Sequence, residues 1–208
     1  MNTETCTHCT RNPPDLKRCT RCRLARYCYN IQGPNCQNAA WSVHKRVCRP
    51  PPSDLPTTPP SARVDGVRLL ARHNTPFLPE AVTVSPEHVV WTTGHTSPIS
   101  QLIGVPLLFH RELREWDVDA GNDPARDNQS VTYMMITPEI GFAPPRWLKN
   151  IGPVTVVRAD QKPLTLLELE KIWMFCDRIL SMFEDNQGPP FNMYYPERYQ
   201  EFSEEYRD

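Results

Sequence analysis

Cysteine and histidine residues near the start of this 208-residue chain constrain its fold more than any other feature. Seven of the eight cysteines lie between residues 6 and 48. An odd number of cysteines would leave one thiol outside any set of disulfides, so a disulfide framework is disfavoured. Two tetrahedral metal sites need eight ligands, and this segment supplies eight: Cys6, Cys9, Cys19, Cys22, Cys28, Cys36, His44 and Cys48.

The ligand types predict two zinc ions per chain. Thiolates and imidazole suit zinc, whereas a set without carboxylates argues against calcium and magnesium. All eight positions would be filled, so no open coordination position remains for a catalytic water, and the zinc is expected to be structural. A segment of under 50 residues has too little apolar material to fold alone, and zinc can supply about 10–16 kcal/mol. Spacing leaves open which ligands share an ion.

The order of these residues resembles a MYND-type zinc finger. The matching positions are two Cys-x2-Cys pairs, Tyr27-Cys28, Cys36-Gln37, Trp41, His44-Lys45 and Cys48. The resemblance implies interleaved chelation, in which the first zinc is bound by Cys6, Cys9, Cys28 and Cys36, and the second by Cys19, Cys22, His44 and Cys48. The chain departs from the family by having seven rather than three residues between Cys28 and Cys36. A turn at Gly33-Pro34 can accommodate the additional residues, so Cys36 is kept as a ligand.

The same resemblance implies a function, because MYND fingers typically bind short proline-containing peptides of partner proteins. The corresponding surface would use Gln37 and Trp41. An indole offers a flat apolar face to proline rings, and a glutamine can pair with an extended backbone. The alternatives are that Trp41 packs against the zinc sites as core and that Gln37 is a solvated residue on a helix surface. The favoured hypothesis is a protein–protein interaction module or adaptor.

Charge is distributed unevenly and raises an alternative function. Residues 1–49 hold nine Lys and Arg against two Asp and Glu, a formal charge of +7, whereas residues 50–208 have a formal charge of -8. A basic finger could belong to a nucleic-acid-binding or transcription-associated protein. Two zinc ions with seven thiolates would reduce the charge to about +4. Few aromatic residues are interleaved with the basic ones, so protein interaction is favoured over nucleic-acid binding.

Composition divides the chain into three parts. Residues 1–49 are expected to form a small zinc finger of α+β type with little regular structure. Residues 50–60 contain six prolines and predict a semi-rigid polyproline linker. Residues 61–208 are expected to form an α+β domain of unknown role. The chain lacks a long apolar run and an apolar leader, so we expect an intracellular protein of the nucleus or cytoplasm without a membrane partner.

The pattern of residues 61–208 predicts a mostly antiparallel sheet and one long helix. Alternating or continuous apolar residues indicate strands. The expected strands are residues 67–72, 81–85, 88–93, 105–110, 130–137 and 153–159. Thr165-Leu-Leu-Glu168 is a capping-box sequence that predicts the start of the helix. The helix has an apolar stripe of Leu169, Ile172, Cys176, Ile179 and Phe183. Residues 116–129 are expected to form a surface loop, and residues 194–208 a short amphipathic helix.

No enzyme motif was found, and the chain is predicted not to be an enzyme. Cys176 lies on the apolar stripe, where a buried thiol is expected rather than a nucleophile. MYND fingers are often joined to SET methyltransferase domains, but the cofactor-binding signature of those domains is absent. Residues 103–180 more loosely resemble the region after the finger in some uncharacterised fungal proteins, which implies no activity. An enzyme with an unrecognised C-terminal domain is the third hypothesis.

Overall fold

The computed structural model of the chain contains two compact units, Met1–Ser53 and Asp54–Asp208. It describes residues 6, 8–9, 11, 13, 16–19, 25–28, 36–45, 48, 59–72, 75–113, 123–138, 141–184 and 196–206. Most of the expected linker, residues 50–58, lies outside the described residues. Each unit is described by itself.

The described part of the N-terminal unit has little regular structure, and its buried residues are mainly cysteine and histidine. Strands β1 (Leu16–Arg18) and β2 (Arg26–Cys28) pair antiparallel. Helix α1 (Cys36–His44) packs on β2. The buried described residues of this unit are Cys6, Cys19, Ala25, Tyr27, His44 and Cys48. Tyr27 is the only large aromatic side chain among them, so the described part of the unit holds too little apolar surface for a conventional core.

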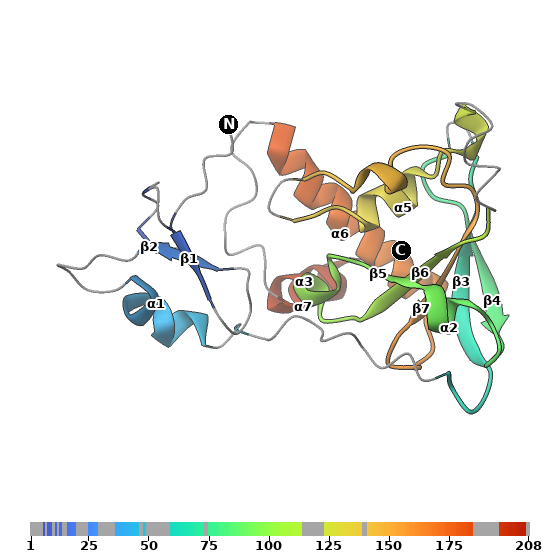
Figure 1. Cartoon of the computed structure of the whole chain (residues 1–208), viewed down its shortest axis with the longest axis horizontal. Helices are drawn as coiled ribbons and strands as arrows, with labels where there is room; N and C mark the ends of the chain where they lie inside the picture. The colour runs from blue at the N-terminus through green and yellow to red at the C-terminus, as the bar shows by residue number, and fades with distance from the viewer. Residues whose placement is uncertain are drawn as a thin grey trace. The chain divides into compact units, whose positions relative to one another are not determined.

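A five-stranded sheet forms the centre of the C-terminal unit (Figure 1). Its strand order is β4-β3-β7-β6-β5, and every neighbouring pair is antiparallel, which confirms the expected sheet type. The strands are β3 (Val64–Leu69), β4 (Pro79–Val84), β5 (His95–Thr96), β6 (Leu107–Arg111) and β7 (Val154–Arg158). Strand β7 comes last in the chain but occupies the middle of the sheet, because its four consecutive buried residues require cover on both faces.

The expected long helix is confirmed as α6 (Leu166–Glu184). The hydroxyl of Thr165 accepts a hydrogen bond from the Glu168 amide at 3.1 Å, as an N-cap residue should. The Glu168 carboxylate does not close a capping box, because it accepts a hydrogen bond from Arg158 at 2.7 Å instead. The predicted apolar stripe is buried in the core at Leu169, Ile172, Cys176 and Ile179.

Apolar side chains cover both faces of the sheet. The larger cluster includes Val67, Phe109, Val156 and Trp147 together with the stripe of α6. The smaller cluster, on the other face, includes Val84, Trp91, Leu108 and Val157. Helix α7 (Pro196–Glu205), which corresponds to the expected amphipathic helix, packs against α3 (Ser100–Ile103) and α6.

Two expected strands are helices in the structure. Residues 130–137 were expected to form a strand, but α5 occupies Gln129–Met134. The side-chain oxygen of Asn128 caps this helix by accepting a hydrogen bond from the Val131 amide at 3.3 Å. Val131, Met134 and Met135 are buried at the i, i+3 and i+4 spacing of a helix, so the β-branched composition was misleading.

The expected strand at residues 88–93 is also wrong, because α2 occupies Val90–Thr93. The ring nitrogen Nδ1 of His88 accepts a hydrogen bond from the Val90 amide at 3.1 Å, and the Trp91 indole donates to the Ser85 carbonyl at 2.9 Å. These local bonds fold the segment into a turn. In the expected loop 116–129, residues 116–122 lie outside the described residues, and Pro124–Arg126 form a 3-10 turn, η1. A second 3-10 turn, η2, spans Pro145–Trp147. Among the described helices, none is long and apolar enough to cross a membrane.

An ion pair joins three strands of the sheet. The Arg68 guanidinium of β3 donates three hydrogen bonds to the Glu112 carboxylate beside β6, at 2.9, 3.0 and 2.7 Å. The hydroxyl of Thr155 on β7 donates to the same carboxylate at 2.9 Å. Burial alone would raise the pKa of Glu112, but the bonds from Arg68 and Thr155 outweigh it and lower that pKa. The ionised carboxylate therefore contributes to the stability of the folded sheet.

We predict that Glu112→Gln lowers the free energy of unfolding of the full chain by about 1–2 kcal/mol at pH 7, because charge-assisted hydrogen bonds are lost. A lowered carboxyl pKa stabilises the fold above the ordinary value of 4.5, and this stability is lost as pH falls through the folded-state pKa. The difference between wild type and variant should therefore shrink on acidification. Urea unfolding, followed by tryptophan fluorescence at neutral and at acidic pH, measures the free energy of unfolding of each protein and its change with pH.

The matched control is Glu80→Gln, because Glu80 lies 3.7 Å from the same arginine but is half exposed. An exposed pair at that distance should contribute less than about 1 kcal/mol. Equal losses for the two variants would contradict the assignment of the stabilising role to Glu112.

Candidate metal centre

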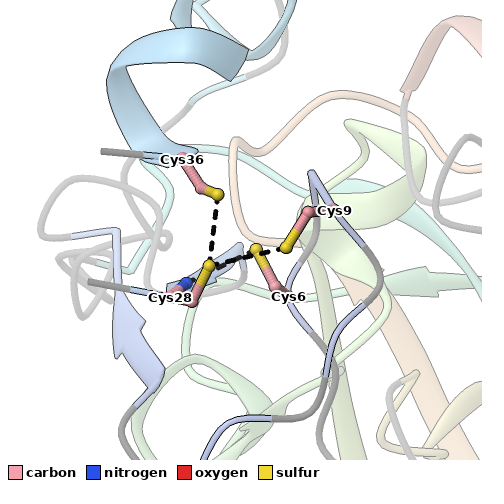
Figure 2. A group of neighbouring side chains, drawn as sticks. All are labelled: Cys6, Cys9, Cys28 and Cys36. Carbon is pink, nitrogen blue, oxygen red and sulfur yellow. Dashed lines mark hydrogen bonds between the residues drawn. The ribbon is translucent and has the colours of Figure 1, made fainter. Parts of the chain in front are cut away.

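Four cysteine sulfurs converge in the first metal cluster, formed by Cys6, Cys9, Cys28 and Cys36. Figure 2 shows the four side chains pointing toward one another. The Sγ atoms of Cys28 and Cys36 are 3.1 Å apart, those of Cys9 and Cys28 are 3.5 Å apart, and all four lie within 4.8 Å of one another. The described cysteines form no disulfide. The resemblance implied this set of four.

Cys19, His44 and Cys48 form the second cluster, and all three are buried. The His44 Nε2 atom is 3.3 Å from the Sγ of Cys19, and the sulfurs of Cys19 and Cys48 are 3.6 Å apart. His44 therefore presents Nε2, rather than Nδ1, to the thiol of Cys19. Cys22, the fourth expected ligand, lies outside the described residues.

These distances fit tetrahedral zinc. Zn–S bonds of about 2.3 Å place two sulfurs roughly 3.8 Å apart, and a Zn–N bond of about 2.0 Å places nitrogen and sulfur roughly 3.6 Å apart. The sulfur–sulfur separations of 3.1–3.6 Å are slightly shorter than this and far longer than a disulfide bond of about 2.05 Å. Soft thiolates with one imidazole are the donor set that zinc prefers. Each cluster could therefore hold one zinc ion, as expected from the sequence.

The strand pair and the helix both extend from one cluster to the other. Cys28 is the last residue of β2, and the antiparallel register places it opposite Leu16, the first residue of β1. Cys19 directly follows the last residue of β1. The two cysteines thus lie at opposite ends of the strand pair, roughly 10 Å apart. Helix α1 begins at Cys36 and ends at His44, which spans roughly 12 Å along its axis. Because the strand pair and the helix have similar lengths, each of them places one candidate ligand in the first cluster and one in the second.

Electrostatics favour the ligand forms of Cys6 and His44 but oppose that of Cys28. Burial raises the pKa of Cys6, but hydrogen bonds from the backbone of Cys9, Cys28 and His8 outweigh it and lower that pKa to about 6. The neighbouring sulfur of Cys36 raises the pKa of Cys28. Burial lowers the pKa of His44 and favours the neutral imidazole that binds metal. A divalent cation would let all four thiols of the first cluster ionise together.

The outer surface of α1 is exposed. Trp41 is 40% exposed and Val43 63% exposed, and His44 is the only described residue of the helix that is buried. The Trp41 ring lies beside that of His44, with centroids 5.8 Å apart. Gln37 precedes Trp41 by four residues, so both lie on the same face of the helix. Trp41 thus packs beside a candidate ligand and keeps part of its surface exposed.

Residues that could suggest other chemistry have structural roles in the C-terminal unit. Asn128 begins a glycosylation sequon, but it is buried, and its amide donates to the carbonyls of Leu69 and Gly152. Cys176 is fully buried, and burial raises its pKa, which agrees with a structural thiol. The ring of His95 lies edge-on to the buried Trp147. Beyond the two cysteine clusters, the described residues hold no group of three potential metal ligands that converge on one point.

Comparison with known proteins agrees with the geometry of the finger. The MYND finger family matches residues 6–48, which confirms the resemblance predicted from the sequence. Histone-lysine N-methyltransferase SMYD3 of Homo sapiens is 42% identical over 67 residues, which are 32% of this chain and 14% of that protein. SMYD3 of Mus musculus is 40% identical over 67 residues, with the same shares. The chain thus spans 14% of the length of these curated relatives. No solved structure matches the chain.

We predict two zinc ions per chain by elemental analysis of protein purified without chelator. Cys6→Ser should lose at least one ion, because serine is a poor zinc ligand at neutral pH. Cys176→Ala is the matched control, since it removes a cysteine from the core of the other unit and should retain both ions. Retention of two ions in Cys6→Ser, or less than one ion in the wild type, would contradict this metal site.

Proposed function

We propose that Cys6, Cys9, Cys28 and Cys36 bind one zinc ion and that Cys19, Cys22, His44 and Cys48 bind the other. We further propose that the resulting finger is an adaptor that binds a proline-containing peptide of a partner protein through Gln37 and Trp41. The observation that supports this most directly is the exposed Trp41 on a helix that begins in one metal cluster and ends in the other.

The position of Trp41 suits a peptide-binding residue. Its neighbour His44 is a proposed ligand, so coordination fixes the helix one turn away from the indole. A side chain on a rigid support loses little conformational freedom on binding, which reduces the cost of association. Tryptophan is among the residues that most often dominate binding energy at interfaces. The remaining indole surface can stack on proline rings, while the Gln37 amide pairs with the peptide backbone.

The proposed role of the zinc ions is structural. Each complete ligand set fills four positions and leaves none for a reacting water or substrate. The matched relatives are named as methyltransferases, but this chain covers only 14% of their length, and we do not transfer that activity. We propose a non-catalytic finger, residues 1–49, joined by a proline-rich spacer, residues 50–60, to an α+β domain. Zinc–thiolate sites persist in a reducing compartment, which favours a protein of the nucleus or cytoplasm.

A peptide array tests the proposed interaction. Each proline-containing peptide is paired with a version in which alanine replaces every proline, and the array is probed with the full chain. We predict that bound peptides lose binding when proline is replaced. Trp41→Ala should weaken binding by about 2 kcal/mol, or roughly 30-fold, because a central tryptophan contact is lost. Fluorescence anisotropy with the best peptide gives the affinity.

Val43→Ala is the matched control, because Val43 is exposed on the same helix but lies on a different face. It should bind the peptide as the wild type does. Zinc content is measured for each variant, so that loss of the fold is distinguished from loss of contact. Wild-type affinity in Trp41→Ala, or loss of zinc with the mutation, would show that Trp41 is not the peptide-binding residue.

A further inference from the structure

Strand β4 forms a long outer edge of the sheet in the C-terminal unit. The strand order places β4 at one edge and β5 at the other. Strand β5 has two residues, whereas β4 has six, Pro79–Val84. Short edge strands offer little backbone for pairing with another chain, but a long edge strand is a template for it. The β4 edge is therefore the place in this sheet where another strand could add.

The register identifies the backbone groups that face outward from β4. The Leu70 amide donates to the Leu78 carbonyl at 2.9 Å, so these two opposed residues form a hydrogen-bonded pair. Bonded and non-bonded pairs alternate in an antiparallel ladder. Glu80, Val82 and Val84 therefore bond to β3, while the amides and carbonyls of Ala81 and Thr83 point away from it. Pro79 contributes only a carbonyl to the outer edge.

A contact on the opposite side of β3 supports this assignment. Asp65 is opposite Thr83, and its carbonyl should therefore point away from β4. It accepts a hydrogen bond from the Leu164 amide at 3.0 Å on that side. Among the residues that the structure describes, none hydrogen-bonds to the outward amides and carbonyls of Ala81 and Thr83. Both residues are exposed.

We propose that β4 pairs antiparallel with β4 of a second copy of this chain, about a two-fold axis at Val82. This register places Ala81 opposite Thr83 of the second copy and, by symmetry, Thr83 opposite Ala81. Both pairs are hydrogen-bonded, so the outward amides and carbonyls of these residues are satisfied together. Two five-stranded sheets become one continuous ten-stranded sheet.

The side chains of β4 favour its own copy as the partner. The two Val82 residues meet as a non-hydrogen-bonded pair, in which opposed side chains are closest, and valine pairs well there. Glu80 is the only charged residue of the strand, and it lies opposite Val84 of the second copy. The two Glu80 residues are four positions apart along the strands, roughly 14 Å. No like charges face each other in this register.

Apolar surface lies next to the same edge. Ala81 and Thr83 line a groove of about 300 Å³ together with Leu164 and Leu166 from the start of α6. Leu166 and Leu167 are each 39% exposed. A second strand that bonds to Ala81 and Thr83 would add apolar contacts beside this groove to the backbone bonds. The proposal rests only on the C-terminal unit and does not depend on the function of the finger.

Sedimentation velocity of the full chain tests the proposal over a series from about 1 μM to about 1 mM, the range expected for a small interface. The wild-type mass should rise from 24.0 kDa toward twice that value. Thr83→Pro removes an outward amide without affecting the ladder with β3, and proline is tolerated on sheet edges. This variant should remain at 24.0 kDa throughout. Thr83→Val, the matched control, keeps the amide and should behave as the wild type.

A charge pair decides the question if Thr83→Pro fails to fold. In the proposed register the two copies of residue 81 are diagonal neighbours, about 7–8 Å apart. Ala81→Lys and Ala81→Glu should each weaken self-association, while an equimolar mixture should restore the dimer. Wild-type protein that stays monomeric at about 1 mM would overturn the proposal. So would dimers of Thr83→Pro at wild-type strength, or a charge mixture that pairs no better than its components.

Discussion

Convergence of cysteine sulfur on two points organises the N-terminal unit. The unit buries Tyr27 and Ala25 but no extended set of apolar side chains among its described residues. Helix α1 has nine residues, and an isolated helix of that length is marginal in water. Burial does not compensate for this, since His44 is its only buried described residue. In the proposed ligand sets, coordination at Cys36 and His44 fixes both ends of the helix, and the binding energy of the ions becomes folding energy.

The C-terminal unit is held together by different means, and this explains which of its elements could be predicted. Helix α6 buries a continuous stripe that includes Leu169, Ile172 and Ile179, so its sequence pattern and its environment agree. Strand β7 has a run of buried residues that fits only a central strand. The segments that form α2 and α5 are short and rich in β-branched residues. The side chains of His88 and Asn128 accept hydrogen bonds from backbone amides in these segments, and composition does not reveal such local bonds.

The metal site was more predictable than the fold around it, because the spacing of the cysteines and of one histidine identifies the candidate ligands. Spacing alone left the partition of ligands open, and the resemblance to a family supplied it. The structure adds a physical reason, since the strand pair and α1 each place one end in each cluster. The exposure of Trp41 could not be derived from sequence, because a tryptophan near a small metal core can pack inward or outward with equal ease. Likewise, the sequence does not show which amides of β4 point outward, because that depends on the register of its pairing with β3.

The way in which each unit is stabilised also determines where it can meet a partner. A helix such as α6 is stabilised by burying its apolar face in the core, so that face is not available to a partner. Under the proposed coordination, helix α1 is fixed at its ends and does not depend on burying its sides, so the partly exposed indole of Trp41 sits on a rigid support. In the sheet, backbone groups are available to a partner only at the edge, because the outermost strand is hydrogen-bonded to a neighbour on one side alone. The proposed side-chain recognition by the finger and the proposed backbone recognition by the sheet are therefore two separate consequences of how this chain compensates for the entropy lost on folding.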